Sequence, residues 1–210
     1  VIRSYGLFGI EAYEVAIEVY LAKGIPAFDI VGLPDGAVRE SRERVRAGLS
    51  NSGFDFPLAR TIINLAPADI KKEGSHYDLG ICIGMLAASA QLEGDFRDLA
   101  FIGELSLTGE LRPITGALCM GLKAREAGVK HLFAPAANAA ELRAASGALQ
   151  IHPARTLTEV VSHLRGERCL PPLTGATEEN ISRLPLPDFA DVAGQQEARR
   201  ALEIAAAGRH

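Results

Sequence analysis

The chain has 210 residues, of which 48% are hydrophobic and 23% are charged, and its formal net charge is −4 at pH 7. This composition is typical of a globular protein that can bury a core without disulfide or metal support. The acidic balance excludes a strongly basic nucleic-acid platform, although it allows a local basic patch. Tryptophan is absent and aromatic residues make up 6%, which argues against a stacking surface for single strands.

The three cysteines, Cys82, Cys119 and Cys169, lie far apart and form no C-x-x-C pair. An odd number at such spacing supports neither a disulfide framework nor a zinc site, and the histidines show no ligand spacing. The sequence contains no signal-peptide pattern and no apolar run long enough to span a bilayer. We therefore expect a cytoplasmic protein that binds no metal and contacts no membrane.

Apolar periodicity predicts a series of strands and helices in the first three quarters of the chain. Strands are expected at residues 13–21, 25–31, 61–65, 100–105, 110–114, 131–133 and 149–152, and helices at 37–50, 78–90, 115–127, 138–145 and 156–164. In the first helix, Val38, Val45 and Leu49 should face inward, and Gly53 should end it. The opening strands follow one another in antiparallel style, whereas later strands and helices interleave. The predicted fold class is therefore α+β, with a mixed sheet and packed helices.

The pattern changes near the C-terminal quarter. Residues 166–187 are rich in proline, glycine and polar side chains, which is typical of a linker. A new amphipathic helix is predicted at residues 195–207. The expected organisation is a domain at 1–165, a linker at 166–187 and the start of a second module at 188–210.

One polar cluster precedes the helix predicted at residue 78. Asp78 suits an N-cap position, where its carboxylate would accept backbone N–H groups of the helix. The alternative is a hydrolytic set of Ser75, His76 and Asp78. We favour the cap, because the members of catalytic triads usually come from distant segments.

A basic stretch lies on the helix predicted at 37–50, where Arg39, Arg42 and Arg46 share one face. The glutamates between them favour a solvated surface of ion pairs. The alternative is an edge that contacts phosphates or a neighbouring subunit, which Lys71 and Lys72 would extend. Such contacts would bind DNA without reading its sequence.

Long motifs then point to one family. They are residues 27–46, which include I-V-G-L-P-D and V-R-E-S, residues 64–74 (N-L-A-P-A-D-I-K-K-E-G), residues 101–112 (F-I-G-E-L-S-L-T-G-E-L-R) and residues 188–202. Together they resemble the amino-terminal domain of the ComM (YifB) family of magnesium-chelatase-like AAA+ ATPases. The resemblance covers essentially the whole chain. It departs from the family pattern at residues 75–77, where proline and small residues are more usual.

The resemblance implies a fold like the Lon-type proteolytic domain. The catalytic serine of such proteases falls at Asp78 of this chain, and the catalytic lysine falls at Leu118. A carboxylate does not replace an activated hydroxyl nucleophile, and leucine provides no base. Lys123 lies more than a helical turn further on and should not substitute. We therefore expect no proteolysis.

The segment 188–210 is similar to the opening of an AAA+ module, in which Val192 and Gly194 match residues that line the adenine pocket. No phosphate-binding loop of the form G-x-x-x-x-G-K-[ST] occurs in the chain, so the pocket is incomplete and no cofactor is expected for this segment.

The resemblance also implies a longer parent protein. That parent would bind ATP and Mg²⁺, form a hexameric ring, and act on DNA as a branch-migration motor or helicase in natural transformation and recombination. This chain would be its non-catalytic accessory domain, which helps assemble the ring or guides DNA and contacts its own AAA+ module. The alternatives are a protein–protein adaptor without DNA contact and, less favoured, a Lon-type peptidase.

Overall fold

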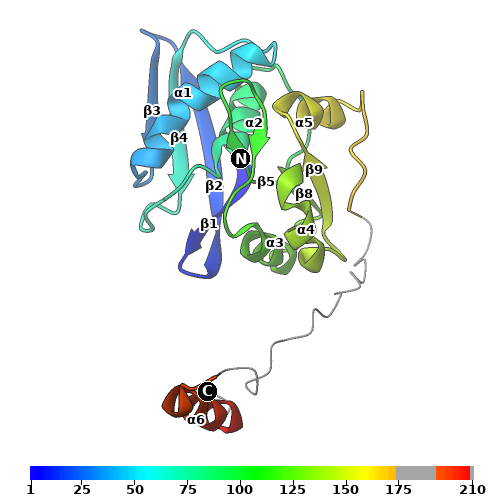
Figure 1. Ribbon diagram of the computed structural model, residues 1–210. Helices are drawn as coiled ribbons and strands as arrows, with labels where there is room; N and C mark the ends of the chain where they lie inside the picture. The colour runs from blue at the N-terminus through cyan, green and yellow to red at the C-terminus, as the bar shows by residue number, and fades with distance from the viewer. Residues whose placement is uncertain (174–192, 209–210) are drawn as a thin grey trace. The chain divides into compact units, whose positions relative to one another are not determined.

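The computed structural model describes residues 1–173 and 193–208, and the contacts divide the chain into two units, Val1–Ala176 and Thr177–His210. The first unit combines strands with helices (Figure 1). Its strands are β1 Ile2–Phe8, β2 Glu11–Ala22, β3 Ala27–Val31, β4 Arg60–Ala66, β5 Leu99–Phe101, β6 Glu104–Leu105, β7 Leu111–Arg112, β8 His131–Pro135 and β9 Gln150–Ala154. Its helices are α1 Gly36–Asn51, α2 Asp78–Ala88, α3 Ala117–Glu126, η1 Ala136–Asn138, α4 Ala139–Leu142, η2 Arg143–Ala145 and α5 Leu157–Leu164. The second unit contains α6, Gln196–Ala207.

Seven strands form one mixed sheet in the order β3-β4-β2-β1-β5-β8-β9. Strand β2 is antiparallel to both of its neighbours, β1 and β4, whereas all the other pairs in this sheet are parallel. The predicted mixed sheet is therefore confirmed. Strand β1 was not predicted, because its residues do not alternate cleanly between apolar and polar; its pairing with β2 defines it.

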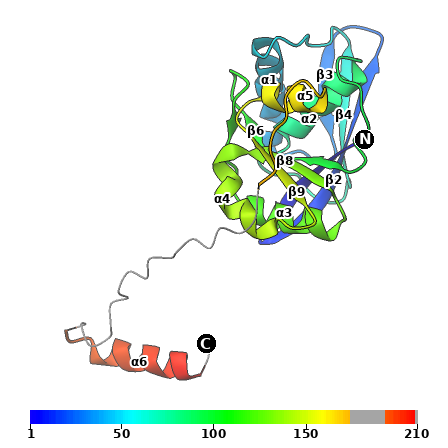
Figure 2. The same cartoon turned by 90° about the vertical axis from the view of Figure 1, so that its right-hand side faces the viewer.

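Helices cover both faces of this sheet. The cluster on one face joins α1, α2 and α5 to the strands, and the cluster on the other face includes α3 and α4. Figure 2 shows α1, α2 and α5 grouped apart from α3 and α4. Neighbouring residues of one strand enter different clusters: Phe133 lies in the first, while Leu132 and Ala134 lie in the second. Burial on both faces explains the continuous apolar run of β8.

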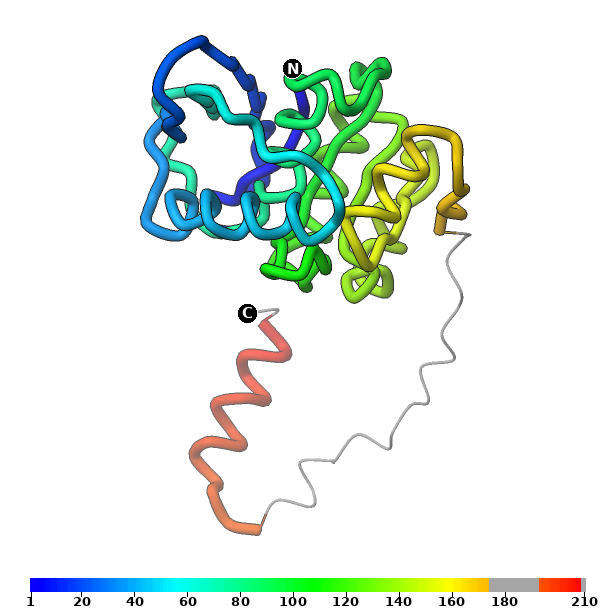
Figure 3. Tube along the Cα trace, turned by 90° about the horizontal axis from the view of Figure 1, so that it is seen from above, coloured from blue at the N-terminus to red at the C-terminus, as the bar shows by residue number. Residues whose placement is uncertain are grey.

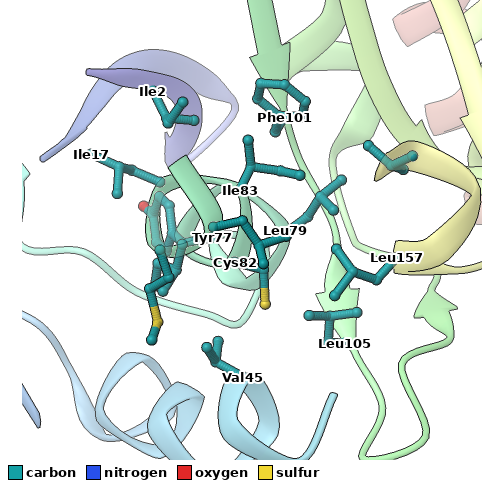
Figure 4. Close-up of a cluster of buried hydrophobic side chains, with 14 of the residues drawn as sticks. Ile2, Ile17, Val45, Tyr77, Leu79, Cys82, Ile83, Phe101, Leu105 and Leu157 are labelled. Carbon is teal, nitrogen blue, oxygen red and sulfur yellow. The ribbon is translucent and has the colours of Figure 1, made fainter. Parts of the chain in front are cut away.

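Helix α2 lies at the centre of the larger core. Figure 4 shows Leu79, Cys82 and Ile83 of α2 surrounded by side chains of other elements, among them Val45 of α1 and Phe101 of β5. A helix that is apolar on all sides is stable only when it is buried on all sides. The predicted buried helix is thus confirmed, although it ends at Ala88.

Helix α1 lies along the β3–β4 end of the sheet (Figure 3). It begins after Asp35, whose carboxylate accepts the backbone N–H of Val38 at 2.7 Å. Val38, Val45 and Leu49 are fully buried, as predicted. The predicted position and inward face of this helix are therefore confirmed.

Three predictions need revision. The helix expected at 138–145 is split into the short pieces η1, α4 and η2. The strand predicted at 100–105 is divided, because residues 99–101 pair in the main sheet as β5, whereas β6 pairs with β7, the shortened form of the strand predicted at 110–114. The start of the predicted linker is packed on the first unit: Leu170 is 6% exposed, and Leu173 donates its N–H to the carbonyl of Ile151 at 2.8 Å. Residues 174–187 lie outside the described residues.

Candidate functional site

The first candidate site is the position of Asp78 at the start of α2. Asp78 is fully buried, and its carboxylate accepts hydrogen bonds from Arg44 Nε at 2.6 Å, from Arg44 NH2 at 3.2 Å and from the N–H of Leu105 at 3.2 Å. The predicted N-cap role is wrong, since Tyr77 occupies the cap position and makes no side-chain cap bond. The carboxylate instead joins α2 to α1 and β6.

Each side chain of the Arg44–Asp78 ion pair makes several hydrogen bonds, and these affect the pKa values of both groups. Burial raises the pKa of Asp78, and the Arg44 guanidinium opposes that effect by stabilising the carboxylate. Burial alone lowers the pKa of Arg44, but the hydrogen bond and charge of Asp78 raise it overall. Arg44 NH2 also donates to the carbonyl of Ala37 at 3.0 Å and to Ser41 Oγ at 3.2 Å. This pair therefore ties three elements together.

The residues before Asp78 each have a different environment. Ser75 Oγ donates a hydrogen bond to the carboxylate of Glu104. His76 is 8% exposed, its Nε2 has no partner within the described part of the chain, and burial lowers its pKa to about 4. The Asp78 carboxylate is bound by Arg44, and in the described part of the chain no side-chain hydrogen bonds link Ser75, His76 and Asp78 to one another. The hydrolytic alternative lacks the geometry of a triad.

Leu118 lies on α3, half-buried against the second core cluster. Lys123 lies further along the same helix, where its ammonium pairs with Glu126 at 3.3 Å on the surface. Leu118 has no amine, and the ammonium of Lys123 is paired with Glu126 rather than with Asp78. The two positions that the Lon resemblance assigns to a serine–lysine dyad therefore hold an ion-paired carboxylate and an aliphatic side chain, and their assignment as dyad positions stays a prediction.

The second candidate site is the basic face of α1. Arg39, Arg42 and Arg46 are all exposed, as the helical spacing predicts. Arg42 pairs with Glu43 at 3.6 Å, both side chains being well exposed, and the Arg46 guanidinium lies 5.5 Å from the centre of the Phe56 ring. Exposed ion pairs of this kind contribute little to stability. The arginines remain accessible to a ligand.

The two lysines do not extend this basic face. Lys72 is fully buried: its ammonium donates to the carbonyls of Pro67 and Ile70, and burial lowers its pKa. Lys71 is exposed but pairs with Glu73 at 2.7 Å, and it lines a separate cavity with residues of β1 and β2. Lys72 is therefore removed from the predicted contact surface, because local backbone carbonyls hold its side chain inside.

Metal binding is not supported by the described side chains. Within residues 1–173 and 193–208, no group of three or more histidine, cysteine or acidic residues is placed to hold a metal ion. Nor does this part of the chain contain a helix with the length and apolar character needed to cross a membrane.

Comparison with known proteins places the chain in a family. A family model described as "Subunit ChlI of Mg-chelatase" matches residues 17–138, and one described as "Magnesium chelatase, subunit ChlI" matches residues 188–210. The chain belongs to the Mg-chelatase ChlI family. Because the first match covers more than half of the chain, the assignment includes the Asp78 site and the basic face of α1.

Two relatives narrow the assignment within the ChlI family. The competence protein ComM of Haemophilus influenzae is 42% identical over the whole chain, and the chain covers 42% of that protein. The YifB protein of Escherichia coli is 39% identical over the whole chain, which covers 41% of it. The chain thus spans about two fifths of the length of these relatives. The predicted membership of the ComM/YifB group is confirmed.

The likeness to Lon is weaker. A Lon protease of Citrifermentans bemidjiense is 31% identical over half of this chain, which corresponds to 14% of that protein. The mixed α/β architecture agrees with the predicted fold class. The Lon-type assignment itself stays a prediction.

The ChlI-family match at residues 188–210 includes the start of the predicted AAA+ module. Gly194 is exposed with φ +73°, just before α6, whereas Val192 lies outside the described residues. The helix predicted at 195–207 is confirmed as α6. The sequence contains no phosphate-binding loop of the form G-x-x-x-x-G-K-[ST], and the role of Val192 and Gly194 in an adenine pocket stays a prediction.

Sequence reasoning missed the roles of Arg44 and Arg60. Arg44 lay within the basic stretch, but its partner Asp78 is 34 residues away and no periodic pattern links them. Arg60 begins β4 as an isolated charge; it pairs with Asp29 at 3.3 Å and lines a cavity of about 570 Å³ together with Arg39 and Arg42. The parallel pairing of β3 with β4 brings Asp29 and Arg60 together, and the packing of α1 at this end of the sheet adds Arg39 and Arg42.

Proposed function

We propose that this chain is the non-catalytic accessory domain of an ATP-driven motor that acts on DNA, followed by the start of that motor's AAA+ module. It works by contact, through the phosphate backbone of DNA and through the motor ring. One observation carries the proposal. Asp78, to which the predicted Lon resemblance assigns the position of the nucleophile, is buried in an ion pair with Arg44.

The loss of peptidase chemistry follows from the properties of these side chains. A nucleophile has to be accessible and activated by a base. Asp78 has no exposed surface, and Leu118 has no group that accepts a proton. A direct test is hydrolysis of labelled casein by the purified chain. Wild-type activity that disappears in Asp78→Ala would contradict this part of the proposal.

The basic face of α1 supports the DNA contact. Arg39 forms no ion pair within the described residues, and Arg42 has only an exposed pair with Glu43. Arginine side chains bind phosphate in a planar, two-pronged geometry. Since the protein as a whole is acidic, we expect weak DNA binding that falls steeply as salt rises.

Family membership supports a proposal about the parent protein and its partners. We propose that the full-length protein binds ATP and Mg²⁺, assembles as a hexameric ring and serves branch migration in natural transformation and recombination. The name of the Haemophilus influenzae relative, competence protein ComM, supports a role of this kind. The ATP site would be completed by residues of the AAA+ module beyond those present in this chain.

Fluorescence anisotropy tests the DNA contact. Labelled single- and double-stranded oligonucleotides are titrated with the chain across a salt series. The variant Arg39→Glu/Arg42→Glu/Arg46→Glu should lose most of the salt-dependent binding. The matched control makes the same change of net charge at three exposed cations elsewhere, Arg97, Arg112 and Lys130. Equal loss in both variants would show a general charge effect and refute the α1 contact.

A second candidate function is a protein–protein adaptor without DNA contact. The exposed apolar side chains at the tip of the β1–β2 hairpin favour it, since Phe8 is 77% and Ile10 is 87% exposed. The anisotropy experiment separates the two functions. Absence of DNA binding even at low salt would leave the adaptor as the better proposal.

A further inference from the structure

We infer that α1 and the free edge of the sheet form a discrete site for a phosphodiester group, in which Arg60 completes a set with Arg39 and Arg42, and Asp29 limits the affinity. The inference rests on the proposed DNA contact. It adds a defined site to that contact, together with Arg60, which lies outside α1, and Asp29, whose carboxylate weakens anion binding.

The site is a cavity of about 570 Å³ at one edge of the sheet. Among the described residues, strand β3 is the last strand on this side of the sheet and pairs with β4 alone (Figure 1). The cavity is lined by Phe28, Asp29, Ile30 and Val31 of β3, Arg39 and Arg42 of α1, and Arg60 and Ile62 of β4. Three elements that are separate in the sequence therefore build one concave surface.

The charges that line this cavity favour an anion. Three arginines and one aspartate line it, and the carboxylate of that aspartate, Asp29, pairs with Arg60 at 3.3 Å between Oδ2 and NH2. Both side chains are about half exposed, at 46% and 56%. Such an exposed pair is weak enough to be exchanged for a stronger acceptor. A phosphate oxygen is the acceptor that arginine clusters bind best.

The rest of the lining favours an organic phosphate over a free ion. Val31 and Ile62, which point to the same face of the paired strands β3 and β4, form an apolar wall beside the arginines, and Val31 is 46% exposed. A phosphodiester links two sugars through its phosphate, and we expect the apolar wall to contact one of those sugars. Arg46 does not line the cavity and lies over Phe56 instead. The three arginines of α1 therefore separate into two that belong to the site and one that does not.

The test uses the whole chain and a labelled single-stranded oligonucleotide at low salt. Arg60→Gln should weaken binding by about three- to tenfold and lower the salt slope by about one, as expected for a lost phosphate contact. Asp29→Asn removes the competing carboxylate and frees Arg60, so it should tighten binding by about two- to threefold. Tighter binding cannot result from a folding defect. The matched control is Arg97→Gln, which breaks an exposed pair with Asp95 and should change nothing.

Two competitors identify the ligand class. Inorganic phosphate should displace the oligonucleotide only weakly, because it lacks the sugar that the apolar wall contacts. Equal displacement by phosphate and by an unlabelled oligonucleotide of the same phosphate concentration would overturn the phosphodiester assignment. Poly-glutamate is the second competitor, and it represents an acidic protein segment that would pair with the edge strand β3. Binding of poly-glutamate that is tighter than that of DNA would also overturn it.

The variants also separate this inference from the proposed function. If Arg60→Gln and Asp29→Asn both bind DNA like Arg97→Gln while the triple reversal on α1 abolishes binding, the cavity is not the site and the DNA contact of α1 stands. If the wild-type chain binds no DNA at low salt, both are wrong.

Discussion

Replacing Arg44 by methionine tests the energetic role of the buried ion pair. The change keeps the aliphatic bulk of the side chain but leaves the Asp78 carboxylate without its cation in the interior. Removal of one partner of a buried pair costs about 3–5 kcal/mol. Asp78 is fully buried but the Arg44 side chain is 18% exposed, so we expect the lower end, about 3 kcal/mol. For a unit of this size the melting temperature should fall by about 6–12 °C.

The same variant should show a defined pH dependence. Burial raises the pKa of Asp78, and loss of Arg44 raises it further. An acid with a higher pKa in the folded state binds its proton more readily when folded. The cost of the unpaired carboxylate is therefore fully present above the folded pKa and decreases as the pH falls. The difference between wild type and Arg44→Met should be larger at pH 7 than near pH 4.

The assay is urea unfolding followed by far-UV circular dichroism, since the chain has no tryptophan. The control is Arg44→Met combined with Asp78→Leu, which removes both charges. This double variant should recover at least half of the lost stability, because no buried charge remains unpaired. The reasoning would be refuted by a cost for Arg44→Met below about 1 kcal/mol, or by a double variant no more stable than the single one.

Two further predictions concern the backbone and a buried imidazole. Gly32→Ala should lower the free energy of unfolding in urea by about 3 kcal/mol or more, because Gly32 has φ +99° and an added Cβ would lie 2.1 Å from the carbonyl oxygen of Leu65. The control Gly36→Ala, whose added Cβ meets open space, should be nearly neutral. Equal losses of stability in the two variants would contradict this reasoning. Burial lowers the pKa of His76 to about 4, so stability should fall as the pH drops from about 6.5 towards 4, by up to about 3 kcal/mol. In His76→Gln this loss should disappear; an unchanged pH profile would exclude His76 as its source.

Much of the local structure could be predicted from the sequence. The spacing of Val38, Val45 and Leu49 predicted both the position of α1 and its inward face, and all three are buried. The apolar run after Asp78 predicted α2. Such patterns are visible because a helix or strand repeats its contacts every few residues.

The candidate site was only partly predictable. The exposed arginines of α1 followed from helical spacing, but the same basic stretch hides Arg44, which turns inward to Asp78. Two adjacent lysines look alike in the sequence, yet Lys71 is exposed and Lys72 is buried. Their difference arises from the carbonyls of Pro67 and Ile70, which satisfy only the second ammonium. Charge patterns of this kind do not record which partner a side chain meets.

The sequence by itself determined the family and the position of helices α1 and α2, and it placed an aspartate and a leucine at the positions predicted for a serine–lysine dyad, Asp78 and Leu118. Each depends on residue identity or on short spacing along the chain. Only the tertiary structure decided that Asp78 is an ion-pair partner rather than a helix cap, and that Arg60 joins Arg39 and Arg42 at one cavity. These facts depend on contacts between segments more than 15 residues apart. The pairing of β3 with β4 and the packing of α1 on α2 create those contacts, and no local pattern specifies them.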